Sequence, residues 1–503
     1  MEIYQDYAWR LSEKIKTQEI TAEELMSSIF DRIAKVEPKV HAFTEYYKED
    51  SLKEAKNIDN LIKQGKKVGK LAGIPLAVKD CICVKGRRTA CGSKMLENYY
   101  PLYNATVVDR LLAEGSIVIG RTNMDEFAMG SSTESSYFGK TYNPWDLSRV
   151  PGGSSGGSGA AIAADETIIS LGSDTGGSIR CPASFCGAYG IKATYGRVSR
   201  FGIVAYSNSL EQIGPLTKCV KDSALMLSIM AGHDPLDSTS AKVPVDDYVS
   251  FLDSGVENTK IGMPKEFFGE GISQDTMKIV KDGIKILEKK GAEIREVSLP
   301  NIRYALPTYY LIAMSEASSN LARFDGIRYG YRTKNKEAVD KLLKEANAQK
   351  KTLSQWAAEY MITRSEGFGP EVRRRIILGK YALSAGYQDQ FFLKALKVRT
   401  LIKNDFLNAL KDVDVLAGPI MPRSAFKIGE KTEDPIEMYM EDILTVPINL
   451  AAVPSLAVHA GFDGNNMPVG MQIMGKYFDE KTVFRVGHTL ETSLNIGSKK
   501  PNL

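Results

Sequence analysis

Two short segments combine serine and glycine in patterns that suit nucleophilic chemistry. One covers residues 151–159 and the other residues 172–180. In the second segment Gly176 and Gly177 precede Ser178, and glycine permits the unusual dihedral angles that let backbone amides converge. Converging amides beside a serine hydroxyl are the geometry that an oxyanion hole requires. The second segment therefore predicts an oxyanion hole next to Ser178.

Charged residues indicate how such a nucleophile would be held and activated. Asp174 and Arg180 flank the glycine turn and are expected to pair, which would brace it. Lys79 is a candidate base, because it follows the apolar run 71–78, whose glycine and proline are typical of a short buried strand. Burial disfavours the charged ammonium and lowers the pKa of a lysine, which can then take up a proton. A lysine at the end of a strand is more often solvated. Lys79 is therefore a credible candidate base only if a nucleophile lies beside it.

The run 151–159 has three other interpretations. A flexible linker would not lead directly into the small-residue stretch 160–164, which suits a buried helix. A phosphate-binding loop would need a Lys-Ser/Thr ending or G-x-G-x-x-G spacing, and this run has neither. A nucleophile elbow at Ser155, with His459 or His488 as base, satisfies G-x-S-x-G. An elbow needs a preceding strand, however, and the preceding residues favour a loop, so we discount the histidine triad.

Together, these segments resemble the amidase signature family, whose members use a Ser-Ser-Lys triad within a G-G-S-S-G-G-S loop. The resemblance implies Ser178 as the nucleophile, Ser154 as the bridging serine that relays its proton, and Lys79 as the base. Neutral Lys79 would draw the proton during attack on an amide carbonyl and return it to the leaving amine. The amides expected to hold the oxyanion are those of Thr175, Gly176 and Gly177.

Segments outside the signature point to one branch of this family. Residues 121–135, 316–326 and 363–369 resemble the A subunits of tRNA-dependent amidotransferases. Such proteins hydrolyse glutamine and pass the ammonia to a B subunit, which uses ATP to activate glutamate carried by tRNA(Gln). A small C subunit braces the pair, and some complexes also act on aspartyl-tRNA(Asn). The resemblance implies L-glutamine as substrate, B and C subunits as partners and tRNA held mainly by the partner. It implies no cofactor in this chain, with ATP and Mg in the partner subunit.

A pocket for free glutamine needs a cation for the carboxylate, an anion for the amino group and an apolar slot between them. Following the family's glutamine site, we assign Arg364 to the carboxylate and Asp434 to the ammonium. Tyr309 or Tyr310 is expected to form a wall of the pocket. Ordinary salt bridges for Arg364 and Asp434, and a core position for the tyrosine pair, are the alternatives.

Two other classes of protein remain open at this point. A stand-alone amidase of small amides would keep the triad without pairing Arg364 and Asp434 around an amino acid. A catalytically silent scaffold would be expected to lose Lys79 or Ser178, and both are present. Two departures from the family pattern are Cys81, where asparagine is expected, and Cys181, where glutamine is expected. Both cysteines are expected close to the site.

The elements around these residues alternate between strands and helices, which favours a sheet covered by helices. A capping box at Thr21 and Glu24 predicts a helix start, and a further helix is expected over 105–114. We expect an α/β amidase signature fold, with a large central mixed sheet, helices on both faces and a mostly helical insertion. Strands are expected at 71–78, 116–120, 168–171, 413–417, 455–458 and 469–474.

We expect one amidase domain over 1–503. Its predicted parts are an N-terminal helical segment (1–66), a core with the triad (67–272), a helical insertion contributing to the substrate pocket (273–410) and a C-terminal part completing the sheet (411–503).

Composition supports a folded protein and excludes several classes. Hydrophobic residues make up 43%, and 65 basic against 61 acidic residues leave a net charge of +4, too small for a strong polyanion-binding field. Neither the cysteine nor the histidine spacing fits a metal site. Without a signal sequence or a long apolar run, a cytoplasmic protein without membrane contact is expected. The basic run 373–375 is expected to decorate a helix whose residues 376–378 face inward, with RNA contact as the less favoured alternative.

Overall fold

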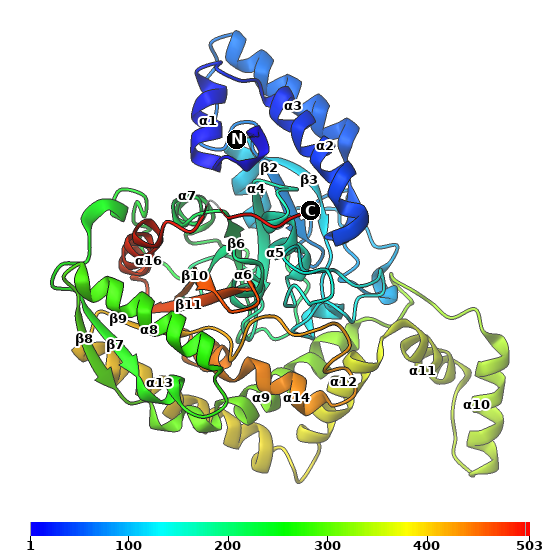
Figure 1. The fold of residues 1–503 in the computed structure, drawn as a ribbon. Helices are drawn as coiled ribbons and strands as arrows, with labels where there is room; N and C mark the ends of the chain where they lie inside the picture. Colours follow the sequence, from blue (N-terminus) through cyan, green and yellow to red (C-terminus); the bar gives the residue numbers. More distant parts are fainter. Residues whose placement is uncertain (1, 498) are drawn as a thin grey trace.

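Within the residues that the computed structural model describes, 2–497 and 499–503, eleven strands form one mixed sheet at the centre of the molecule (Figure 1). The strand order is β1-β3-β2-β4-β6-β5-β10-β11-β9-β7-β8. All six predicted strand runs are confirmed, and they correspond to β2, β3, β4, β9, β10 and β11. The strands are β1 (Phe43–Tyr46), β2 (Pro75–Lys79), β3 (Ile117–Thr122), β4 (Ile169–Asp174), β5 (Tyr189–Lys192), β6 (Gln212–Thr217), β7 (Lys260–Pro264), β8 (Glu293–Val297), β9 (Val415–Pro419), β10 (Ser455–Phe462) and β11 (Pro468–Gly475).

Helices surround this sheet. The α-helices are α1 (Ala8–Lys16), α2 (Ala22–Val40), α3 (Lys48–Lys63), α4 (Thr106–Ala113), α5 (Gly156–Ala163), α6 (Arg180–Cys186), α7 (Val220–Met230), α8 (Gln274–Lys289), α9 (Ala305–Asn320), α10 (Lys336–Ala348), α11 (Gln355–Gly367), α12 (Pro370–Ala382), α13 (Lys394–Asp412), α14 (Pro435–Met440), α15 (Val446–Ala451) and α16 (Glu480–Leu494). Short 3₁₀ turns relevant to the site are η2 (Lys94–Leu96), η3 (Glu126–Ala128), η7 (Leu321–Arg323) and η9 (Glu441–Leu444).

Neighbouring residues of β11 contact helices on opposite faces of the sheet. A Cβ atom at Gly470 would lie 2.7 Å from the Ser184 hydroxyl of α6. A Cβ atom at Gly283 of α8 would lie 3.3 Å from the sulfur of Met471. Because successive residues of a strand point to opposite faces, α6 and α8 cover different faces. The predicted mixed sheet with helices on both faces is thus confirmed.

The sheet topology brings two strand ends to one edge. Strand β2 pairs in parallel with both β3 and β4, and Val78 lies opposite Leu171. Lys79 is the last residue of β2, and Asp174 is the last residue of β4. Since parallel strands end at the same edge of a sheet, the side chains that follow these ends can meet.

Helix α2 begins where the capping box in the sequence predicts. Thr21 Oγ accepts from the Glu24 amide at 3.0 Å, and the Glu24 carboxylate accepts from the Thr21 amide at 2.7 Å. Leu25, Ile29 and Ile33 of α2 are buried in the core. The capping box therefore starts α2, whose apolar side faces inward. Segment 1–66 also supplies β1, which pairs with β3 at the edge of the sheet.

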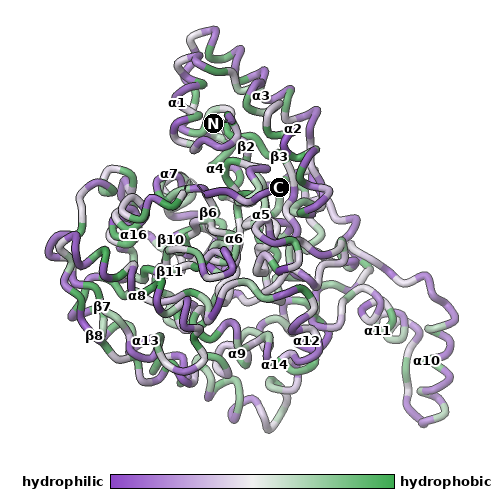
Figure 2. Tube along the Cα trace, in the orientation of Figure 1, coloured by the Kyte–Doolittle hydropathy of each residue, from purple (hydrophilic) through white to green (hydrophobic). Residues whose placement is uncertain are grey.

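The segment 273–410 is mostly helical but includes one strand. Strand β8 pairs in parallel with β7, which in turn pairs with β9. Three of the five residues of β8 are charged, and none of the five is fully buried, as suits an exposed edge strand. Helices α10 and α11 project from the body, and α10 is largely hydrophilic (Figures 1 and 2). Across the described residues, no helix is both long and apolar enough to cross a membrane.

Candidate active site

Lys79 lies at the centre of a cluster of serine hydroxyls. Its Nζ donates to Ser154 Oγ at 2.8 Å, to Ser155 Oγ at 2.8 Å and to Ser173 Oγ at 2.9 Å. The side chain is fully buried, and that burial lowers the pKa of Lys79 below its ordinary value. Burial thus favours the neutral amine, which can accept a proton from a hydroxyl that it touches.

The glycine-serine run is tightly packed. A Cβ atom at Gly153 would lie 2.1 Å from a carboxylate oxygen of Asp125, and one at Gly157 would lie 2.4 Å from the Ala42 carbonyl oxygen. The peptide bond between Gly153 and Ser154 is cis. These glycines are required by close approach, which excludes a flexible linker.

Ser178 lies on the adjacent segment, just before α6, and is 8% exposed. Its carbonyl oxygen accepts from the Ser155 amide at 3.2 Å, which ties the two serine segments together. Among the described residues, the Ser178 hydroxyl makes no hydrogen bond of its own. The predicted bridging serine is therefore bonded to Lys79, while the hydroxyl of the predicted nucleophile is unengaged.

A buried ion pair braces the Ser178 segment, as the sequence predicts. Arg180 donates from Nε to Asp174 Oδ2 and from Nη2 to Asp174 Oδ1, both at 3.0 Å. Burial alone would raise the pKa of Asp174, but the Arg180 charge outweighs it and holds that pKa at about 2. Arg180 also reaches Asn449 and Gln472. The paired hydrogen bonds between Arg180 and Asp174 hold the loop that carries Ser178 in place.

The three amides predicted for the oxyanion hole differ in their bonding. The Gly177 amide donates to Asp174 Oδ1 at 2.9 Å, so it braces the loop. In the described part of the chain, the amides of Thr175 and Gly176 make no hydrogen bond. A Cβ atom at Gly176 would lie 2.5 Å from the phenol oxygen of Tyr309. The Tyr309 side chain thus lies directly against the loop of the predicted nucleophile.

The structure does not bring Arg364 and Asp434 together as the sequence predicts. Arg364 donates from Nη1 to the carbonyl oxygens of Leu321 at 2.7 Å and Phe324 at 3.0 Å. Asp434 is exposed and caps α14 by accepting from the Ile436 amide at 2.8 Å. Asp434 is therefore engaged in a local helix cap, and Arg364 is engaged by backbone carbonyls of a distant segment of the insertion.

A different Arg-Asp set lies beside the predicted tyrosines. Tyr310 Oη donates to Asp442 Oδ2 at 2.7 Å, and both residues are buried. The Arg375 guanidinium is also buried, with its carbon 5.2 Å from the ring centres of both Tyr310 and Tyr439. Burial raises the pKa of Asp442 to about 6. Tyr309 on the same helix contacts Gly176, so this set adjoins the nucleophile loop.

The expected orientation of α12 is wrong at Arg375, Ile377 and Leu378, although Ile376 packs against the core and Arg373 and Arg374 are exposed as expected. Ile377 is 68% exposed and Leu378 is 45% exposed, whereas Arg375 is 3% exposed. Arg375 Nε donates to Glu371 Oε1 at 2.8 Å. The sequence offers one signal for this burial, a glutamate four residues before Arg375. A Glu-Arg pair at this spacing lies on one side of a helix, so the glutamate can neutralise a buried guanidinium. Asp442 has no comparable signal in the sequence.

Two cysteines border the site, as expected. Cys81 Sγ lies 3.7 Å from Ser173 Oγ, and a Cβ atom at Gly152 would lie 3.0 Å from Cys181 Sγ. All six cysteines are free and buried. No group of three or more metal-ligating side chains suited to a metal ion occurs in residues 2–497 and 499–503.

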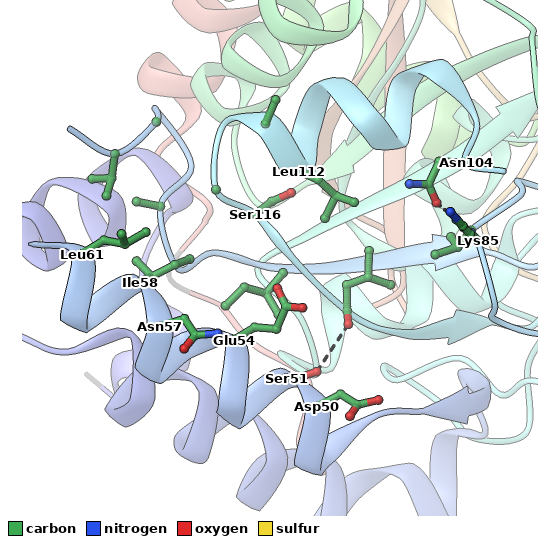
Figure 3. A pocket seen from close by; sticks show the side chains of 18 of the residues that line it. Asp50, Ser51, Glu54, Asn57, Ile58, Leu61, Lys85, Asn104, Leu112 and Ser116 are labelled. Atoms are coloured by element: carbon green, nitrogen blue, oxygen red, sulfur yellow. Dashed lines mark hydrogen bonds between the residues drawn. The ribbon is translucent and has the colours of Figure 1, made fainter. Parts of the chain in front are cut away.

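A surface pocket of about 550 Å³ lies elsewhere, between α3, β3 and the C-terminal end of α4 (Figure 3). Figure 3 shows Asp50, Glu54 and Asn57 of α3 along its side. Lys79, Ser154 and Ser178 do not line it. This pocket is separate from the serine-lysine cluster.

Residues 24–484 match the profile of the amidase family, and the chain belongs to this family. The A subunit of glutamyl-tRNA(Gln) amidotransferase from Carboxydothermus hydrogenoformans is 53% identical over 503 residues, covering all of both chains. The protein of the same name from Geobacillus kaustophilus is 53% identical over 505 residues, again over both full lengths.

Solved structures agree with this assignment. The A subunit of glutamyl-tRNA(Gln) amidotransferase from Thermotoga maritima superposes with a TM-score of 0.78 and 39% identity, covering 97% of this chain and 95% of that chain. A peptide amidase from Stenotrophomonas maltophilia superposes with a TM-score of 0.79 and 27% identity, covering 99% and 98%.

Proposed function

We propose that this chain is the glutaminase subunit of a tRNA-dependent amidotransferase. The observation that carries the proposal is the buried Lys79-serine cluster next to a tyrosine pair that contacts one buried cation, Arg375, and one buried anion, Asp442. Full-length relatives at 53% identity, named as the A subunit of glutamyl-tRNA(Gln) amidotransferase, support the same assignment.

In the proposed reaction, Ser178 attacks the side-chain amide carbon of glutamine. The proton of its hydroxyl passes through Ser154 to the neutral Lys79 amine. The C–N bond then breaks, Lys79 returns the proton through Ser154 to the leaving nitrogen, and ammonia departs. The product is a glutamyl ester on Ser178. A water molecule, deprotonated along the same route, hydrolyses this ester and releases glutamate.

Backbone amides of the Ser178 loop would stabilise the oxyanion formed at each step. The proposed donors are Thr175, Gly176 and Gly177, as the sequence indicates. Because the Gly177 amide already donates to Asp174, we assign the larger share of oxyanion stabilisation to the amides of Thr175 and Gly176. The Asp174–Arg180 pair keeps this loop in place while charge develops.

For glutamine recognition, we propose Arg375 and Asp442 in place of Arg364 and Asp434. Arg375 would bind the α-carboxylate and Asp442 the α-ammonium. Tyr309 and Tyr310 would form the wall between this end of the substrate and Ser178. The support is that Tyr310 bonds Asp442, Arg375 faces Tyr310, and Tyr309 touches Gly176.

The ammonia would be passed to a B subunit that uses ATP and Mg to activate glutamate on tRNA(Gln), with a C subunit bracing the complex. Aspartyl-tRNA(Asn) is a second acceptor under the same scheme. The near balance of charge in this chain fits a tRNA held mainly by the partner. A cytoplasmic location follows from the same proposal.

Transfer of labelled nitrogen tests the proposal. The chain, co-expressed with its proposed partners, is given glutamine labelled with ¹⁵N at the side-chain amide, glutamyl-tRNA(Gln), ATP and Mg. We expect ¹⁵N in the glutamine esterified to tRNA and one glutamate released per transfer. Cleavage of small aryl amides without release of glutamate from glutamine would contradict the proposal and favour a stand-alone amidase.

A further inference from the structure

One buried carboxylate at the edge of the insertion has no part in the serine-lysine cluster. Glu126 of η3 is 4% exposed. Its Oε1 accepts from Ser93 Oγ at 2.5 Å, and its Oε2 accepts from the Gly369 amide at 2.8 Å. Gly369 is the residue that caps the start of α12. Glu126 therefore fastens the first turn of α12 to the core.

The fit between Glu126 and Gly369 leaves no spare room. A Cβ atom at Gly369 would lie 2.3 Å from Glu126 Oε2. The backbone of Gly369 has φ −68° and ψ 170°, which any residue can adopt. A methyl group at Gly369 would therefore displace the Glu126 carboxylate, although the backbone conformation itself would allow it.

A neighbouring aromatic contact strengthens the same junction. The Phe127 ring lies 5.2 Å from the Phe324 ring and 5.5 Å from the Phe368 ring, measured between centroids. The Arg364 guanidinium lies 4.9 Å from the Phe368 ring centre and donates to the Phe324 carbonyl. Arg364 therefore holds two parts of the insertion together at this point.

Helix α12 carries Arg375 about one and a half turns after Gly369. Arg375 Nε donates to Glu371 Oε1 at 2.8 Å, and its Nη1 donates to Tyr206 Oη at 2.7 Å. Tyr439 Oη also donates to Glu371 Oε1, at 2.7 Å. Because a helix moves as a rigid unit over two turns, a shift of its first turn displaces Glu371 and Arg375 together.

We propose that Glu126 is a positioning residue for glutamine binding: by holding the Gly369 amide it sets the place of the Arg375 guanidinium relative to the Ser178 loop. This inference rests on the proposed function, since Arg375 is assigned there to the substrate carboxylate. Glu126 does not touch the substrate and acts through α12.

The positioning role does not depend on the charge of Glu126. Burial raises the pKa of Glu126 to about 7, and the charged group that faces it is Arg373 of α12. A protonated carboxyl keeps a carbonyl oxygen that accepts from Gly369 and gains a proton to donate to Ser93. A glutamine side chain offers the same acceptor and donor. The variant Glu126→Gln should therefore rescue what Glu126→Ala loses.

A double-mutant cycle on the full chain, co-expressed with its proposed partners, tests this inference. We expect Glu126→Ala to raise KM for glutamine about tenfold while kcat stays within about twofold. Gly369→Ala should raise KM similarly, because the added methyl group displaces the carboxylate. Once Glu126 is truncated the methyl group has room, so Gly369→Ala should add little in the double variant. Glu126→Gln should return KM to within about threefold of the wild type.

Two covalent probes separate this inference from the proposed function. A glutamine-like electrophile should label Ser178 more slowly in Gly369→Ala, whereas a small sulfonyl fluoride without an amino acid head should label it at the wild-type rate. If neither probe labels Ser178 in the wild-type protein, the proposed function is contradicted. A fall in kcat with unchanged KM, additive effects in the cycle, or equal slowing of both probes would overturn the positioning role. Gly369→Ala, which removes no buried group, keeps the test valid if Glu126→Ala fails to fold.

Discussion

The two serine segments and the helical insertion meet in one site, yet they encode their parts of it differently. In the serine segments, Gly153 and Gly157 leave no room for a side chain, and Lys79 is buried among hydroxyls. In the insertion, Arg364 and Arg375 lie on successive helices, and only Arg375 faces the tyrosines next to the Ser178 loop. Catalytic residues that are held by close packing within short segments can be found from a sequence motif. Residues proposed for substrate recognition, whose position depends on how a helix packs, cannot.

The largest expected effect is loss of catalysis in the serine-lysine cluster. Ser178→Ala and Lys79→Ala should each lower kcat for glutamine hydrolysis by roughly 10³–10⁵-fold, because nucleophile and base act as one unit. The kcat of the double variant should lie within about threefold of the kcat of the less active single variant. Steady-state release of glutamate measures this, and additive losses would show that the two residues act independently.

Breaking the buried brace should cost the most stability. Asp174→Asn leaves the Arg180 charge without its partner in a fully buried place, which costs about 3–5 kcal/mol of the free energy of unfolding. Asp434→Asn is the control, because Asp434 is exposed and asparagine also caps a helix, so a change below about 0.5 kcal/mol is expected. Urea unfolding of both variants measures these changes. Similar losses of unfolding free energy in the two variants would refute the stabilising role of the Asp174–Arg180 pair.

The two arginines provide a direct comparison of recognition. Arg375→Gln should raise KM for glutamine about 100-fold, since a charge-assisted contact worth roughly 2–3 kcal/mol is lost. Arg364→Gln should raise it less than about threefold, and Arg373→Gln, on the same helix as Arg375, should leave it near the wild-type value. A larger rise in KM for Arg364→Gln than for Arg375→Gln would restore the assignment made from sequence.

The smallest expected effect is the pH dependence of the catalytic step. Burial lowers the pKa of Lys79, and only its neutral form accepts the proton. Activity should therefore fall as pH decreases through that lowered pKa, with kcat/KM decreasing up to about tenfold per pH unit. A pH profile of kcat/KM for glutamine hydrolysis measures this. A profile that rises toward low pH would contradict a neutral lysine base.

The sequence predicts the sheet well because the strands that position the site are short apolar runs beside glycine and proline, as in β2 before Lys79. It also predicts the Asp174–Arg180 pair, because the two residues flank a short turn. These features depend on neighbours in the chain. The same is true of the capping box at Thr21 and Glu24.

The residues proposed to bind glutamine cannot be predicted in the same way. Arg375, Tyr310 and Asp442 come from three separate segments, and their pairing depends on how α9 and α12 pack. The apolar neighbours Ile377 and Leu378 suggest the wrong inward face for α12. An exposed Asp434 near a proline looks equally suitable by residue type, although it serves as a helix cap.

Covalent labelling of Ser178 is the decisive experiment for the assignment of the serine-lysine cluster to glutamine hydrolysis. The chain, with and without its proposed partners, is exposed to a glutamine-like electrophile, and the adduct is located by mass mapping. We expect one adduct, on Ser178, which free glutamine prevents and which the Lys79→Ala substitution abolishes. An adduct on another residue, or labelling of Ser178 that glutamine does not compete, would contradict the assignment of this cluster to glutamine hydrolysis.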